Sequence, residues 1–122
     1  MLQLIARPHR NGGYSSWRTP ARPGKGETTF DLVDGNDQLV LSLGTLQTGM
    51  VDQQLAEFWG RVIYRLRRYG MTADYRRGLA EQLMRAGVPL PETADWPGAA
   101  RPGWSEVAAE LAGLIRDMDR VA

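Results

Sequence analysis

The stretch from Val51 to Tyr69 constrains the fold most, because it carries a long and regular helical pattern of apolar side chains. Apolar residues recur in it at spacings of three and four, which places them on one face of an α-helix of about five turns. The members of this face are Val51, Leu55, Phe58, Val62, Leu66 and Tyr69, widened by Trp59 and Ile63. Because this face must be buried, we expect a long central helix with Phe58, Val62 and Leu66 in the core. Glu57 precedes Arg61 by four residues, so the two are expected to form an ion pair.

The first third of the chain carries β-strand patterns instead. Glu27–Val33 and Gln38–Leu43 alternate apolar and polar residues, and the short segment Met1–Arg7 alternates weakly. Pro8 is expected to stop the N-terminal strand. The glycines and prolines of the segment His9–Gly26 exclude a regular helix and predict a long loop that is either functional or mobile.

The two clearer strands are expected to form a hairpin around the turn sequence at residues 34–37, Asp-Gly-Asn-Asp. A two-residue turn at Gly35-Asn36 would pair Phe30 with Leu41 and Leu32 with Leu39. Both apolar sets would then share one face. The opposite, solvent-facing side would carry Thr29, Asp31, Gln38 and Ser42.

Two further helices are expected after the first. Gly70 is placed to end the first helix in a left-handed conformation, and Thr72 to cap the second. Gly87 and the prolines that follow it end the second helix. The last helix is expected to begin near Trp104-Ser105, after an irregular connector over residues 92–103.

These elements predict an α+β fold in which a small antiparallel sheet, the N-terminal strand plus the hairpin, packs on the long central helix. With 122 residues the chain is expected to be a single domain, with a β-rich part over 1–46 and a helical part over 50–122. The chain has no cysteine, which excludes disulfides and thiolate metal sites. No apolar run approaches membrane-spanning length and the start does not resemble a signal peptide, so no membrane association and a cytoplasmic location are the default expectation.

The sequence carries no pattern typical of an enzyme. His9 is the single histidine, and no partner residues suggest an activated nucleophile or a helical metal site. The segment from Arg22 to Thr29 resembles a phosphate-binding loop only faintly, because Gly26 stands where a serine or threonine belongs. Glu106 and Glu110 are expected to be solvated on an exposed helix face. We therefore expect no catalytic residue, no metal site and no cofactor.

Charge is distributed in blocks although the net charge is only +1. Residues 1–26 hold five cations and no acid, and residues 27–57 hold six acids and no base. Residues 61–85 are again basic, and residues 92–122 are acidic. The blocks either form separate surface patches or neutralise each other, depending on the fold. The preference for arginine is typical of phosphate or carboxylate contacts, but codon usage in a GC-rich genome would produce it equally well.

Two basic segments are candidate binding surfaces. In the first, cations alternate with aromatic residues, a pattern that suits a phosphate backbone with stacked bases; its members are Arg10, Tyr14, Trp17, Arg18, Arg22 and Lys25. The alternative is a solvated loop whose tryptophan packs on the core. The second is an arginine ridge on two helices, with Arg61, Arg65, Arg68, Arg76 and Arg77 as its members. The alternative for this ridge is a solvated face with intramolecular salt links.

These patterns favour a non-enzymatic binding module that contacts nucleic acid, or a nucleic-acid-bound complex, through arginine-rich surfaces. The alternative is a protein-interaction module, such as a small phage or mobile-element inhibitor or an assembly subunit, with exposed aromatic residues as anchors. The two differ in salt dependence, because phosphate contacts weaken steeply with salt. The sequence identifies neither the partner nor the oligomeric state.

Overall fold

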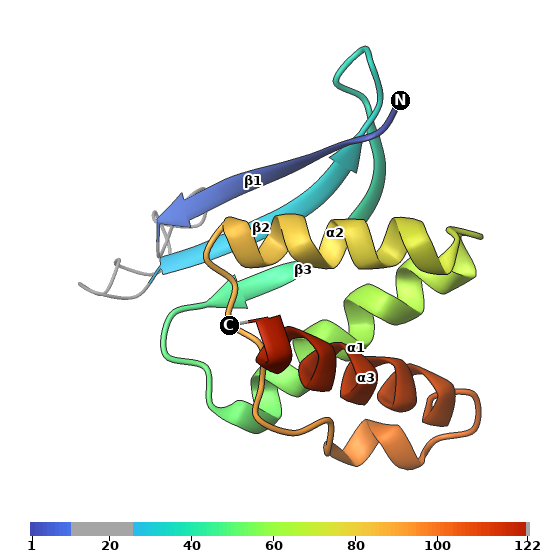
Figure 1. The fold of residues 1–122 in the computed structure, drawn as a ribbon. Coiled ribbons are helices and arrows are strands. Elements are labelled where there is room, and N and C mark those ends of the chain that lie inside the picture. Colours follow the sequence, from blue (N-terminus) through green and yellow to red (C-terminus); the bar gives the residue numbers. More distant parts are fainter. Residues whose placement is uncertain (11–25, 122) are drawn as a thin grey trace. The chain divides into compact units, whose positions relative to one another are not determined.

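The structure, a computed structural model, describes residues 1–10 and 26–121 of the chain (Figure 1). Within these residues it contains a three-stranded antiparallel sheet, three α-helices and one short 3₁₀-helix, which confirms a mixed α+β composition. The chain divides into two compact units, Met1–Met50 with the strands and Val51–Ala122 with the helices. The predicted packing of the sheet on the first helix, and the single-domain organisation, stay predictions.

The sheet of the first unit has the strand order β1-β2-β3, so β2 lies in the middle. β1 spans Gln3–Arg10, β2 spans Gly26–Val33 and β3 spans Leu39–Gln47. The expectation that Pro8 stops the first strand is wrong, because β1 continues through Pro8 opposite Thr28. β1 pairs on one side only, and an edge strand tolerates a proline because the missing N–H need not join a ladder.

The hairpin between β2 and β3 is present, but the predicted register is wrong. Leu32 lies opposite Leu41 and Val33 opposite Leu39, with an irregularity between these two pairs. A second irregularity follows Phe30, which lies opposite Gly44. Leu32 therefore pairs two residues, and Phe30 three residues, farther along β3 than predicted, and the apolar residues of β3 do not all share one face.

The turn explains the first residue of this displacement, and the two irregularities add the rest. The Asp34 N–H donates to the Gln38 carbonyl at 3.0 Å, so three residues rather than two connect the strands. The Asp34 carboxylate accepts from the backbone N–H of Asn36 at 2.8 Å and of Gln38 at 3.0 Å. Asp37 takes the left-handed conformation, with φ of 59°. This is a three-residue hairpin loop that ends in a left-handed residue, and it moves every following pair by one position.

The register changes which residues of the sheet are buried. Leu39 is 57% exposed, whereas Leu43 is fully buried. Asp31, expected on the solvent-facing side, is only 5% exposed, and its carboxylate Oδ2 lies 3.5 Å from the Arg7 Nε. The alternation along β3 therefore did not predict its buried face.

The helical unit matches the sequence closely. α1 spans Asp52–Arg68, α2 spans Ala73–Arg85 and α3 spans Ser105–Val121, with the 3₁₀-helix η1 at Pro97–Ala100 (Figure 1). α1 contacts α3, and α3 contacts η1. None of the helices within residues 1–10 and 26–121 is long and apolar enough to cross a membrane.

Glycines end both of the first two helices as expected. Gly70 and Gly87 have φ values of +91° and +99°, a region that glycine occupies without steric cost. After α1, the Met71 N–H reaches back to the Leu66 carbonyl at 3.0 Å, the hydrogen bond of a Schellman motif. The predicted cap of α2 is also present, since the Tyr75 N–H donates to the Thr72 hydroxyl oxygen at 3.1 Å.

The middle of the apolar face of α1 is buried as the periodicity predicts, whereas Val51 and Tyr69 at its two ends are 62% and 51% exposed. Phe58, Val62 and Leu66 are 5%, 2% and 1% exposed. Trp59 is fully buried, and its indole N–H donates to the Pro89 carbonyl at 2.8 Å. The chain after α2 is thereby attached to α1 through a partly buried hydrogen bond.

Candidate functional site: an arginine and tryptophan cleft

α1 presents a line of arginines on its exposed face. Arg61, Arg65 and Arg68 follow one another at spacings of four and three, so they lie on one side of the helix, and all three are exposed. The Arg61 guanidinium makes the expected ion pair with Glu57 at 2.7 Å, and its side chain remains 56% exposed. The Arg68 guanidinium lies 5.8 Å from the centre of the Tyr64 ring and donates to the Tyr64 hydroxyl oxygen at 3.2 Å. We call Arg61, Arg65 and Arg68 the arginine line.

Three other arginines of the two helices bond to acids of α3 instead. Arg76 donates to both oxygens of the Glu110 carboxylate, from Nε at 2.8 Å and from Nη2 at 2.7 Å. Arg67 donates to Glu110 at 2.9 Å and to Glu106 at 2.8 Å. Arg77 donates to Asp117 at 3.0 Å. The acids of α3 therefore hold α1 and α2 together through charged hydrogen bonds.

Glu110 is the centre of this clamp and is not the solvated residue that the sequence predicts. Its side chain is 27% exposed, and that of Arg76 is 12% exposed. Burial raises the pKa of the Glu110 carboxyl, but the hydrogen bonds and charges of Arg76 and Arg67 outweigh it and hold this pKa below its ordinary value. The hydrogen bond to Glu110 in turn raises the pKa of Arg76. The charge of Arg76 is thus compensated inside the helical unit.

Trp96, just before η1, packs edge-on against two glycines. A methyl group at Gly60 of α1 would lie 2.7 Å from the indole Cζ2, and one at Gly98 would lie 2.7 Å from the indole Nε1. Any side chain at either position would collide with the ring. The indole is only 6% exposed and has a fixed position beside α1.

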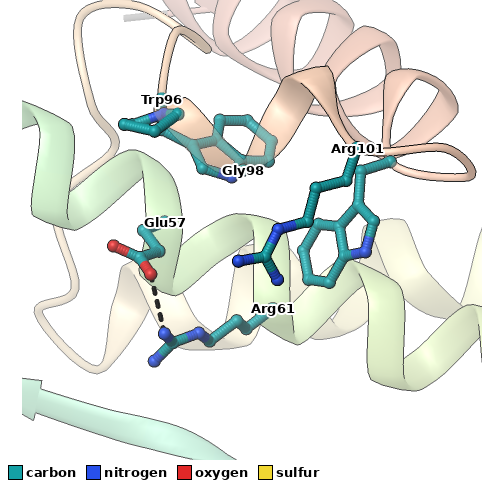
Figure 2. Close-up of a pocket in the computed structure, with 7 residues that line it drawn as sticks. Glu57, Arg61, Trp96, Gly98 and Arg101 are labelled. Atoms are coloured by element: carbon teal, nitrogen blue, oxygen red, sulfur yellow. Dashed lines mark hydrogen bonds and ion pairs between the residues drawn. The ribbon is translucent and has the colours of Figure 1, made fainter.

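A cleft of about 360 Å³ opens next to Trp96 (Figure 2). Its walls come from α1 and from the segment that contains η1; the lining side chains are Glu57, Arg61, Trp96, Pro97, Arg101 and Trp104. Figure 2 shows Arg61 and Arg101 extending into the cleft from these two separate segments. Among these residues only Arg61 is a site residue predicted from the sequence.

Aromatic rings form a continuous wall at one side of the cleft. Trp104 stacks on Tyr64 with a centroid distance of 4.4 Å and an interplanar angle of 9°. Trp96 meets Trp104 edge to face, at 6.5 Å and 78°. Since Arg68 lies over the same Tyr64 ring, the arginine line and the aromatic wall adjoin each other along α1.

The charge of the cleft is positive. Two guanidinium groups face one carboxylate, and that carboxylate is already bonded to Arg61. Arg101 is exposed, and its guanidinium has no hydrogen bond to any of the described residues. The site combines an available cation with flat apolar surfaces, which suits an anionic ligand that carries an aromatic ring.

The two predicted basic surfaces have different outcomes. Arg61, Arg65 and Arg68 lie together, while Arg76 and Arg77 bond to α3. The first basic segment consists of Arg10, Tyr14, Trp17, Arg18, Arg22 and Lys25. All of these except Arg10 lie within residues 11–25, outside the described residues, and only the backbone of Arg10 is described. A surface that this segment shares with the arginine line therefore stays a prediction.

Sequence reasoning missed Trp96, Arg101 and Trp104. Their signal was present as Trp-Pro-Gly at 96–98 and Arg-Pro-Gly-Trp at 101–104, two aromatic residues in a connector rich in proline and glycine. Connectors of this kind run over the surface, where binding residues are often found.

Comparison with known proteins gives no relative: no family model, no curated protein and no solved structure matches the chain. The residues that the structure describes contain no group of three or more histidine, aspartate or glutamate side chains suited to holding a metal ion.

Proposed function

We propose that this chain is a non-enzymatic binding module that contacts nucleic acid, or a nucleic-acid-bound complex, through the arginine line of α1 and the adjoining cleft. The observation that supports the proposal is the placement of three arginines on one face of α1. Arg61, Arg65 and Arg68 are exposed there, and the face continues into aromatic rings through Tyr64 and Trp104.

The arginine line suits contacts to a phosphate backbone. From Arg61 to Arg68 the helix rises about 10 Å, so the three guanidinium groups can meet successive phosphates of one strand. Arginine donates in a planar fork that matches a phosphate, and such contacts release bound counterions. The affinity should therefore fall steeply as the salt concentration rises.

The aromatic wall favours a single strand over a duplex. Bases of a single strand are free to stack on exposed aromatic side chains, and every base has a suitable face. Tyr64 stacks on Trp104, and Trp104 lines the cleft together with Arg61. Stacked bases on this wall and phosphates on the arginine line would belong to the same strand.

Fluorescence anisotropy with a labelled single-stranded oligonucleotide at two salt concentrations tests this proposal. The combined variant Arg61→Ala, Arg65→Ala, Arg68→Ala should stay folded and lose affinity, and each lost phosphate contact should lower the salt slope by about 0.7 units of log K per log salt. A double variant of exposed arginines, Arg85→Ala and Arg116→Ala, is the control for a general loss of charge. Equal losses in both variants, or no binding by the wild type at low salt, would contradict the proposal.

A protein-interaction module is the second candidate function. The observation in its favour is that Arg61 already has an intramolecular partner, Glu57, and that the cleft wall includes Pro97 beside two tryptophans. Aromatic residues in such a pocket are typical anchors for a protein partner. Binding that persists at high salt and requires Trp104, but not the arginine line, would favour this candidate.

A further inference from the structure

We infer that the cleft is a subsite for one nucleotide, with the phosphate on Arg101 and Arg61 and the base against Trp104 and Trp96. The ligand chemistry is a phosphate attached to an aromatic base, whether in a free mononucleotide or in one unit of a strand. The inference extends the proposed function, because Arg61 belongs both to the arginine line and to this cleft.

The size of the cleft suits a single unit. Its volume of about 360 Å³ lies at the lower end of the range of about 300–1,000 Å³ in which small-molecule sites fall. A longer segment of a strand would have to continue outside it, along the arginine line. The cleft therefore sets the position of one nucleotide and does not enclose an oligonucleotide.

The aromatic wall is already in place before a ligand arrives. Trp96 packs closely on both Gly60 and Gly98, since a methyl group added at either position would lie 2.7 Å from its ring. Trp104 is supported on one face by Tyr64, at a centroid distance of 4.4 Å, and its ring lines the cleft. A base that stacks here does not have to order these side chains first, so less conformational entropy is lost on binding.

The charges decide where the phosphate lies. Arg61 is bonded to Glu57 at 2.7 Å, whereas the Arg101 guanidinium has no hydrogen bond to any side chain of the described chain. The Glu57 carboxylate would repel a phosphate next to it. The phosphate is therefore expected on the Arg101 side of the cleft, with Arg61 as the second and weaker contact.

The test is a titration with adenosine 5′-monophosphate, with adenosine and inorganic phosphate as the two partial ligands, followed by calorimetry or tryptophan fluorescence. The wild type should bind the monophosphate more tightly than either part. Arg101→Gln should lower the affinity for the monophosphate about tenfold or more, to a value close to the affinity for adenosine, because the substitution removes the phosphate contact. Arg85→Gln, an exposed arginine of α2 outside the cleft, should have no effect.

The aromatic contact is tested separately. Trp104→Phe keeps a flat ring and should retain most of the affinity for the monophosphate. Trp104→Leu should lower this affinity about tenfold, which is within the range measured when one stacking aromatic residue is removed. Circular dichroism shows whether each variant is folded. Arg101→Gln changes an exposed side chain whose guanidinium has no hydrogen bond to the described residues, so this variant is expected to fold. It keeps the inference testable even if Trp104→Leu fails to fold.

Competition with the labelled oligonucleotide separates this inference from the proposed function. If the monophosphate binds, depends on Arg101 and displaces the oligonucleotide, both stand and the source is a unit of a strand. If it binds in this way but no oligonucleotide binds, the subsite stands with a free nucleotide as its ligand, and the proposed function fails. If oligonucleotides bind through the arginine line while the monophosphate does not bind, or binds equally well to Arg101→Gln, the subsite is refuted and the proposed function remains. No binding of either ligand overturns both.

Discussion

Replacing Gly60 by alanine tests the close packing that builds the cleft. Gly60 lies in the middle of α1, where alanine is the better helix former by about 1 kcal/mol. The new methyl group, however, would lie 2.7 Å from Cζ2, 3.0 Å from Cη2 and 3.3 Å from Cε2 of Trp96. The indole also packs closely on Gly98, where an added methyl group would lie 2.7 Å from Nε1. Overpacking of this kind costs about 1–3 kcal/mol.

Gly78 provides a matched control in the middle of α2. Nothing lies within 4 Å of a methyl group added at Gly78, so Gly78→Ala should stabilise the protein by the helix preference alone, about 1 kcal/mol. The preference is common to both changes and cancels in their difference. The free energy of unfolding of Gly60→Ala should therefore lie about 1–3 kcal/mol below that of Gly78→Ala.

Urea denaturation followed by circular dichroism measures this difference. The free energies of unfolding of the two variants can be compared if their m-values are similar. Gly60→Ala should also weaken nucleotide binding, because the Trp96 ring must shift. If Gly60→Ala stabilises the protein as much as Gly78→Ala does, Trp96 is not fixed against α1 and the account of the cleft wall is wrong.

Three further predictions concern the clamp and the hairpin. Glu110→Gln removes the charge that Arg76 and Arg67 share and should lower the free energy of unfolding by about 1–3 kcal/mol, as measured by urea denaturation; an unchanged midpoint would show that the clamp is not stabilising. The folded pKa of Glu110 lies below its ordinary value of 4.5. The contribution of the ionised carboxylate to the free energy of unfolding is therefore complete above pH 4.5 and is lost as the pH falls through the folded pKa. Acid should destabilise Glu110→Gln less than the wild type, and equal acid sensitivity would contradict the lowered pKa of Glu110. Asp34→Ala removes two hydrogen bonds of the turn and should cost about 1 kcal/mol, whereas Asp34→Asn, which keeps an acceptor oxygen, should cost less; equal losses would mean that the side chain does not set the loop.

The helices could be predicted from the sequence because their signals are local. The apolar spacing of α1, the cap at Thr72 and the ends at Gly70 and Gly87 each depend on a few neighbouring residues. The hairpin register could not be predicted from alternation, because the Asp34 carboxylate bonds to the backbone of the turn and selects a three-residue loop. One added loop residue reverses the face of everything that follows it.

The candidate site was predictable only in part. Arg61 and its ion pair with Glu57 follow from helical spacing, but Trp96, Arg101 and Trp104 are more than thirty residues away in the sequence. They reach the cleft through the packing of α1 with α3 and of α3 with η1. The Arg76–Glu110 contact is likewise a tertiary pairing. Opposite charges at matching helical spacings were visible in the sequence, yet nothing local indicated which helices would meet.

The most direct test of the central claim, that nucleic acid binds at the cleft beside α1, is an NMR titration of the tryptophan indole N–H signals with a single-stranded oligonucleotide. The Trp104→Phe variant assigns one of the signals. The account predicts that the signals of Trp96 and Trp104 shift and saturate with the binding isotherm. The signal of Trp59, which is fully buried and donates to the Pro89 carbonyl at 2.8 Å, should stay in place. Binding of the oligonucleotide with the Trp96 and Trp104 signals unchanged would contradict the account.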